Sequence, residues 1–176
     1  AAAIERSEKV THLVTDKTGT LTEGKPSVVE VMTTEACDEE ALLKLAAAVE
    51  AQSEHPLGRA VVDHAKDANL KLPEVDDFDS ETGSGVTAKV SGQTIRIGKP
   101  EYLQEAGIEV SEDWTSKADD LQAAAKTVIW VGRDSELLGL IAVADPIKQT
   151  SKQAIEALHE MGVKVVMCTG DNAKTA

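Results

Sequence analysis

The sequence predicts an α/β protein in which an α+β domain is inserted into a partial, doubly wound α/β domain. Two observations indicate the outer domain: an apolar-leaning strand begins near Thr11 and ends in Asp16, and a helix at residues 150–161 precedes a buried strand at residues 163–167. Short alternating runs between turns indicate antiparallel hairpins in the middle of the chain. We therefore expect an outer domain of residues 1–25 and 143–176 around an insert of residues 26–142.

The expected elements follow from periodicity and turn residues. After the turn at Gly24-Lys25-Pro26, alternation predicts a strand over residues 27–33. Asp38 suits the N-cap of a helix ending near Gln52, and Pro56 suits the first turn of a second helix. The remaining expected elements are strands 75–79, 86–90 and 94–98, helices 101–106 and 112–125, and strands 127–131 and 137–143.

Composition narrows the class of protein. The 176 residues are 41% apolar but only 2% aromatic, so the core must consist of Val, Leu, Ile and Ala, which suits parallel strands packed by Ala-rich helices. A net charge of −13 argues against nucleic acid and anionic membranes as partners. Two distant cysteines suggest neither a disulfide framework nor a thiolate metal site. No apolar run approaches the ~20 residues that span a bilayer.

The loop after the first expected strand carries the main chemical signal. A carboxylate at the carboxyl end of a strand lies where open α/β sheets bind ligands, and Gly19 with three threonines can hold a phosphoryl group. Asp16 is the candidate nucleophile, because carboxylates form aspartyl-phosphates, and Lys17 would offset the incoming charge. The alternative for Asp-Lys-Thr-Gly alone is an ordinary turn.

The run Asp16-Lys17-Thr18-Gly19-Thr20-Leu21-Thr22 resembles the phosphorylation motif of the P-type ATPases. The resemblance implies that Asp16 accepts the γ-phosphoryl group of ATP. It also implies that the Asp16 carboxylate and the Thr18 carbonyl hold Mg²⁺, that Thr18 contacts phosphate, and that the outer domain has a haloacid-dehalogenase-like fold.

A second loop follows the last expected strand. Thr169-Gly170-Asp171 places a hydroxyl, a flexible glycine and a carboxylate where it can face the same phosphate, and a simple strand-to-helix turn is the alternative. The three residues resemble the family's phosphate-binding Thr-Gly-Asp, which makes them site residues. Asp145-Pro146 resembles the hinge between the two domains.

The insert carries the candidate nucleotide site. His55 precedes a helix-starting proline, where its ring can stack on or hydrogen-bond to a base, although a lone His-Pro is more often a surface turn. Here it resembles the Ser-x-His-Pro signature of heavy-metal P-type ATPases, in which the histidine orients adenine and a glutamate five residues earlier, Glu50, supports it. The remaining candidates are Gly83 and Gly85, which resemble the family's Gly-x-Gly or form a strand-entry bulge, and Gly98 with Lys99.

Lys99 departs from the copper-type pattern, which commonly has asparagine after this glycine. Two interpretations of Lys99 stay open: an electrostatic contact with phosphate, or a solvated residue at the start of a helix. The runs at residues 142–148 and 165–172 look most like copper(I) exporters.

The resemblance implies the ATP-binding cytosolic portion of a heavy-metal P-type ATPase, with Cu⁺ the favoured cargo. ATP and Mg²⁺ are the expected cofactors, and the transmembrane and actuator domains of the same protein are the expected partners. The location is the cytoplasmic face of a membrane, and the transported ion binds elsewhere. Because further family elements would lie beyond residue 176, we expect little or no turnover by this chain alone. The alternatives are a Zn, Cd or Co transporter, a haloacid-dehalogenase-type phosphatase with a cap domain, which Thr18 disfavours, and a non-catalytic ATP-sensing module.

Overall fold

The structure is a computed structural model that describes residues 10–168. The described residues form two compact units, one made of residues 10–25 and 145–168 and the other of Pro26–Ala144. Among these residues no helix has both the length and the apolarity needed to cross a membrane.

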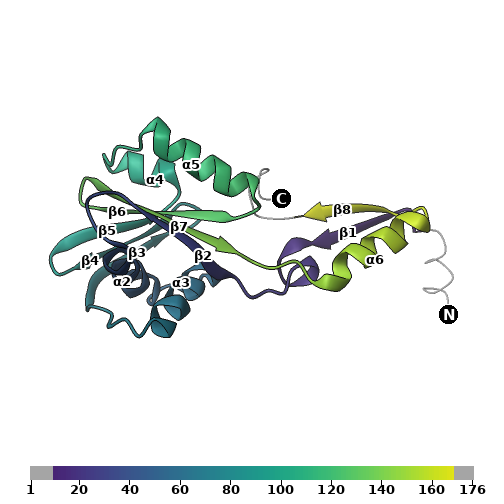
Figure 1. Ribbon diagram of the computed structural model, residues 1–176, viewed down its shortest axis with the longest axis horizontal. Helices are drawn as coiled ribbons and strands as arrows, with labels where there is room; N and C mark the ends of the chain where they lie inside the picture. Colours follow the sequence, from purple (N-terminus) through teal and green to yellow (C-terminus); the bar gives the residue numbers. More distant parts are fainter. Residues whose placement is uncertain (1–9, 169–176) are drawn as a thin grey trace. The chain divides into compact units, whose positions relative to one another are not determined.

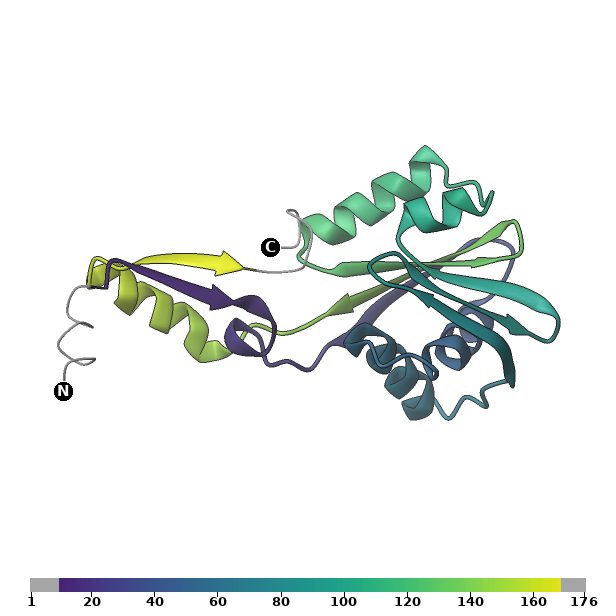
Figure 2. The same cartoon turned by 180° about the vertical axis from the view of Figure 1, so that it is seen from behind.

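The first unit is built around two parallel strands (Figure 2). Strand β1 (His12–Asp16) lies before the insert in the sequence and β8 (Lys164–Cys168) lies after it, and His12 pairs with Lys164 while Asp16 pairs with Cys168. Helix α6 (Gln149–Glu160) precedes β8 and contacts it, as the helix-then-strand pattern predicts. Because the strands are parallel, their carboxyl ends meet at the same edge, which is where Asp16 lies.

The expectation that the strand at residues 163–167 is buried is wrong for β8, and β1 is also largely exposed. Val14 is 64% exposed and Val166 is 45% exposed, and the burial of β8 alternates between half-buried and exposed. On α6, Ile155 is half-buried, and Met161, which directly follows the helix, is 76% exposed. The physical reason is that parallel strands are buried only when both faces of their sheet are covered, and in this part of the chain α6 is the helix that contacts β8.

The second unit contains a six-stranded antiparallel sheet in the order β2-β7-β6-β5-β4-β3. The expected hairpins are confirmed, and the β4–β5 turn has positive φ at both Ser91 and Gly92, as a type I′ turn requires. The sequence analysis did not predict that the strand leaving the Asp16 loop joins this sheet beside β7. The strands are β2 (Ser27–Thr33), β3 (Val75–Glu81), β4 (Gly85–Val90), β5 (Gln93–Gly98), β6 (Thr127–Arg133) and β7 (Glu136–Ala144).

Helices cover both faces of this sheet, as Figure 1 shows. From Leu140 to Val143, alternate residues of β7 therefore enter different cores: Ile141 and Val143 pack with α2 and α3, whereas Leu140 and Ala142 pack with α4 and α5. The buried residues of the core beside α2 and α3 are aliphatic, as composition predicts, but the core beside α4 and α5 also contains Trp130 and Tyr102, which the composition argument did not include. The helices are α2 (Glu39–Glu50), α3 (Pro56–Asp67), α4 (Pro100–Glu105) and α5 (Glu112–Ala123).

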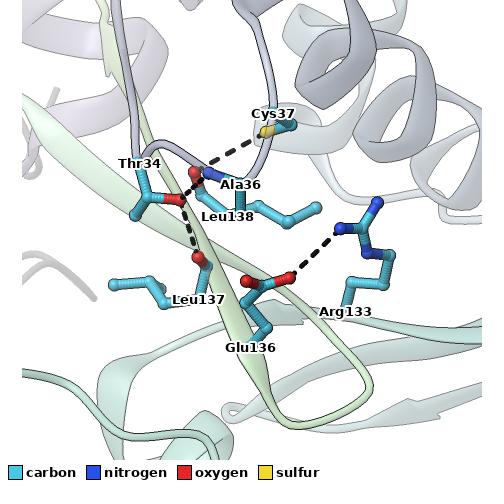
Figure 3. Close-up of polar contacts among 7 residues, drawn as sticks. All are labelled: Thr34, Ala36, Cys37, Arg133, Glu136, Leu137 and Leu138. Carbon is cyan, nitrogen blue, oxygen red and sulfur yellow. Dashed lines mark hydrogen bonds and ion pairs between the residues drawn. The ribbon is translucent and has the colours of Figure 1, made fainter.

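The connection from β2 to α2 is held against β7 by polar contacts (Figure 3). The Thr34 hydroxyl donates to the Leu137 carbonyl at 2.9 Å and accepts from the Ala36 N–H at 3.2 Å. The Cys37 thiol points to the Leu138 carbonyl at 3.8 Å, and burial raises the pKa of this thiol. Cys37 is therefore a packing residue in its neutral form.

Candidate functional site

Asp16 ends β1 and begins the loop that follows, Lys17–Leu21. Its Oδ1 accepts a hydrogen bond from the Lys17 N–H at 2.8 Å, and its side chain is exposed. An exposed carboxylate at the carboxyl edge of parallel strands is accessible to a ligand, which a nucleophile requires. The structure therefore places Asp16 as the sequence predicts.

The loop turns at Thr18 and Gly19. Thr18 has φ −71° and ψ 123°, and Gly19 has φ 75° and ψ −14°, which are the central angles of a type II turn. The second central position of that turn needs a positive φ, so glycine is the residue that adopts it without strain. Gly19 thus sets the direction in which the chain leaves Asp16.

Thr22 closes the loop from inside. Its side chain is 1% exposed, and its Oγ1 accepts from the Gly19 N–H at 3.0 Å and donates to Asp145 Oδ2 at 2.6 Å. Asp145 Oδ1 also accepts from the Lys25 N–H at 3.0 Å. Asp145, which the sequence indicated as a hinge, is thus a direct support of the Asp16 loop.

Two residues at the start of α6 hold carbonyl groups of the same loop. Lys148 Nζ donates to the Gly19 carbonyl at 2.7 Å, and the buried Ser151 hydroxyl donates to the Leu21 carbonyl at 2.7 Å. Sequence reasoning missed these roles, together with that of Thr22. The available signal was position, because Thr22 closes the seven-residue run and Lys148 follows Asp145 by three residues.

The second predicted loop, Thr169-Gly170-Asp171, lies outside the described residues. The strand that leads to it is described, and its last residue, Cys168, pairs with Asp16.

The Asp16 loop offers ligands suited to Mg²⁺. A carboxylate at Asp16 and the backbone carbonyl at Thr18 are hard oxygen donors two residues apart, and Mg²⁺ takes one or two carboxylates alongside substrate phosphates. Across residues 10–168 the structure has no group of three or more His, Cys, Asp and Glu side chains placed to hold a metal ion. The donor set fits a metal ion that is shared with a phosphorylated ligand.

In the insert, His55 is the N-cap of α3. Its ring Nδ1 accepts the Leu57 N–H at 3.2 Å, and the backbone N–H of His55 donates to Ser53 Oγ at 3.1 Å. A neutral ring whose Nδ1 accepts carries its proton on Nε2. The exposed ring therefore presents an Nε2–H donor and an aromatic face to any ligand at this position.

Glu50 is the last residue of α2 and is only 7% exposed. Burial raises the pKa of its carboxyl from 4.5 to about 7, and the Ser53 side chain opposes this shift in part. A methyl group at Gly58 would overlap Glu50 Oε2 and lie 2.9 Å from its Cδ, so α3 approaches this carboxyl closely. Buried carboxyls with a raised pKa cluster at functional sites.

The glycine candidates belong to a second group. Gly85 pairs with Gly98 across β4 and β5, and the Lys99 N–H donates to the Ser84 carbonyl at 3.0 Å. A side chain at Gly85 would overlap the Ile97 carbonyl and lie 2.7 Å from Tyr102 Cδ1, so packing alone requires glycine there. Gly83 has φ 82° in an open turn, and Lys99 is exposed at the start of α4.

The predicted nucleotide residues thus form two separate groups within the described insert, one of two residues and one of four. Glu50 and His55 flank the α2–α3 connection, while Gly83 and Gly85 lie beside Gly98 and Lys99 where β3, β4, β5 and α4 meet. Among residues 10–168, no hydrogen bond joins the group of Glu50 and His55 to the group of glycines and Lys99. Sequence reasoning also missed Tyr102. The Arg96 guanidinium lies over its ring, 5.6 Å from the centroid, and the ring packs against Gly85.

Comparison with known proteins assigns the class. Residues 10–176 match the family model "haloacid dehalogenase-like hydrolase". An aspartate at the carboxyl end of a parallel strand, with an insert directly after its loop, agrees with that match. The chain belongs to the haloacid dehalogenase-like hydrolases.

Within this class, the whole chain is homologous to metal-transporting P-type ATPases. It is 45% identical over 176 residues to the silver exporting P-type ATPase of Salmonella typhimurium, covering 100% of this chain and 21% of that protein. It is 43% identical over 181 residues to the probable copper-transporting ATPase PacS of Synechocystis, covering 100% of this chain and 24% of that protein. The chain therefore spans about a fifth of the length of these curated relatives.

A solved structure supports the same relationship. The crystal structure of a zinc-transporting PIB-type ATPase in its E2.Pi state matches with a TM-score of 0.70 at 36% identity. The match covers 99% of this chain and 28% of that one. The resemblance predicted from the short motifs is confirmed over the full length of the chain.

Proposed function

We propose that this chain is the ATP-binding and phosphoryl-accepting part of a heavy-metal-exporting P-type ATPase. Transmembrane and actuator domains of the same protein are its partners, and it lies on the cytoplasmic face of a membrane. The observation that carries the proposal is Asp16, exposed at the shared carboxyl edge of β1 and β8, in a chain homologous to P-type ATPases along its whole length.

In the proposed reaction, Asp16 attacks the γ-phosphorus of ATP and ADP leaves, so the loop must hold the carboxylate in line with the phosphate. The type II turn at Thr18 and Gly19 fixes the path of the loop, and Lys17 offsets the negative charge of the phosphate. Thr169, Gly170 and Asp171 are proposed to contact the same phosphoryl group. Bound Mg²⁺ would neutralise charge on the transferring group, held by the Asp16 carboxylate and the Thr18 carbonyl.

The insert is proposed to bind the nucleotide. His55 offers an Nε2–H donor and a ring face to adenine, with Glu50 beside it. Gly83, Gly85, Gly98 and Lys99 are proposed to contact the remainder of the nucleotide. Because Gly85 is also required for packing against Tyr102, a loss of function at Gly85 alone would not prove contact with a ligand.

Cargo is proposed from the relatives alone. Relatives named for copper support Cu⁺, while those named for silver and zinc keep neighbouring subclasses open. The flanking sequence tests this directly, because a Cys-Pro-Cys or a Ser-Pro-Cys in an apolar run upstream would identify both the subclass and its cargo.

The test is to titrate ATP into the chain and to follow acid-stable radiolabel from γ-labelled ATP in the longer protein that the proposal implies. We expect ATP binding with little or no multiple turnover by the chain, and label on Asp16 in the longer protein that disappears in Asp16→Asn. Rapid hydrolysis of a generic phosphate ester would instead support the phosphatase alternative. ATP binding without any label in the longer protein would support an ATP-sensing module.

A further inference from the structure

The peptide groups on both sides of Gly19 are held by side chains. The N–H of Gly19 donates to Thr22 Oγ1 at 3.0 Å, and its carbonyl accepts from Lys148 Nζ at 2.7 Å. Glycine is the residue with the widest choice of φ and ψ, so an unrestrained Gly19 would let the loop change course three residues after Asp16. These two contacts remove that freedom.

The hydrogen-bond direction at Thr22 is determined by Asp145. The Thr22 hydroxyl has two acceptors in reach, the Lys17 carbonyl at 3.3 Å and Asp145 Oδ2 at 2.6 Å, and the much shorter contact to the carboxylate takes its single proton. Its lone pairs then remain to accept the Gly19 N–H. The amide side of Gly19 is thus fixed by a buried pair, with Thr22 1% exposed.

The Gly19 carbonyl is held by the side chain of Lys148. Lys148 immediately precedes α6, and backbone and hydroxyl groups of the same segment also hold Leu21, whose carbonyl accepts from the Lys148 N–H at 2.9 Å and from the Ser151 hydroxyl at 2.7 Å. Those contacts do not depend on the Lys148 ammonium group. Replacing this side chain therefore releases the Gly19 carbonyl while the anchor at Leu21 remains.

We propose that Lys148 is a positioning residue for phosphoryl transfer, which holds the Asp16 loop in its productive form by binding the Gly19 carbonyl. This inference rests on the proposed function. Misplacement of a reacting group by about 1 Å can cost on the order of a hundredfold in rate. A partly mobile loop is therefore expected to lower the phosphorylation rate without affecting ATP binding in the insert.

Three variants test the proposal in the longer protein. Lys148→Met removes the donor, Lys148→Arg keeps one, and Lys152→Met removes a neighbouring α6 lysine whose side chain is 83% exposed. We expect Lys148→Met to slow labelling of Asp16 at least tenfold with unchanged ATP affinity. Lys148→Arg should recover most of the rate, and Lys152→Met should match the wild type.

An NMR readout on the 176-residue chain follows the loop itself. Lys148→Met should shift the Gly19 and Thr20 amide signals and speed exchange of the Gly19 amide, while the signals of the insert and the melting temperature stay as in the wild type. Wild-type labelling rates in Lys148→Met, or a slow Lys148→Met whose Gly19 signals are unchanged, would overturn the proposal. If the wild type itself takes no label, the proposed function is wrong, and unchanged Gly19 signals would then reject the contact independently.

Discussion

At the residue scale, Glu50 is a buried carboxyl that is proposed to support nucleotide binding. It is a 7% exposed carboxyl on an otherwise apolar helix face, and burial raises its pKa to about 7. The folded state therefore holds this proton at pH values where the unfolded chain, with a pKa near 4.5, has released it. Stability should fall as pH rises from about 4.5 to about 7 and then stay level with respect to this group.

The first prediction follows from this loss of stability at high pH. Glu50→Gln should raise the free energy of unfolding at pH 8, with an upper limit of about 3 kcal/mol, and change it much less at pH 4.5. Urea unfolding at the two pH values measures this, with exposed Glu54→Gln as the control. If Glu50 contacts adenine, the same variant binds ATP more weakly although it is more stable. A difference in stability between variant and wild type that is the same at both pH values would show that the pKa of Glu50 is not raised in the folded state.

The second prediction concerns the close approach of α3 to this carboxyl. Gly58→Ala should displace Glu50, because the new methyl group would overlap Oε2 and lie 2.9 Å from Cδ. Overpacking of this kind typically costs about 1–3 kcal/mol, and ATP binding should weaken with it. A double-mutant cycle with Glu50→Ala checks the cause, since the cost of Gly58→Ala should shrink when the Glu50 side chain is absent. Equal costs in both backgrounds would contradict the contact.

At the level of elements, α3 is preceded by its N-cap His55, for which capping and the proposed contact with adenine can be separated. His55 caps the helix through Nδ1, while its opposite nitrogen and ring face are proposed to meet adenine. Asparagine is a good N-cap without an imidazole ring. The third prediction is that His55→Asn keeps the wild-type melting temperature but loses ATP affinity, whereas His55→Ala loses affinity and about 1 kcal/mol of stability.

Thermal melting and ATP titration of the two variants provide the measurement. An Asn variant that binds ATP as the wild type does would show that the ring has no contact with the nucleotide. The capping role would remain in that case.

The elements themselves could be predicted because their signals are local. The Asp38 and Pro56 signals, the Ser91-Gly92 turn and the period-two runs each lie within one element, and every expected helix and strand in the described residues is present. The pairing of Ser27 with Ala144 has no local signal, so the place of β2 in the sheet was not predicted. Burial of β8 was wrongly predicted because it depends on which elements cover the strand.

The candidate site also has residues that short runs of sequence identify and contacts that no such run contains. Asp16, His55 and the glycines are recognisable from short runs, and their local geometry agrees with the roles proposed for them. The contact between Thr22 and Asp145 spans 123 residues, and that between Lys148 and Gly19 spans 129, so no window of sequence contains either pair. At Gly85 the short run is recognisable, but it does not show a role in binding, because packing against Tyr102 already requires glycine at this position.

For the whole molecule, the insert enters after Lys25 and leaves at Asp145, and those two residues are joined by a hydrogen bond of 3.0 Å. The ends of the insert therefore meet at the residues that support the Asp16 loop. An insertion whose ends lie close together leaves the first unit's strand pairing intact. The parallel pairing of β1 with β8 is consistent with this.

The last prediction is that residues 26–144 fold alone and bind ATP as the whole chain does. All six strands of the antiparallel sheet, both hydrophobic cores, and Glu50, His55 and the glycine candidates lie within this range. Cooperative urea unfolding and ATP titration of the excised range test this, with Asp16→Asn in the whole chain as a matched control that should leave affinity unchanged. An excised range that unfolds cooperatively but binds ATP at least tenfold more weakly would mean that residues of the first unit contribute to nucleotide binding, which would contradict the assignment of ATP binding to the insert alone.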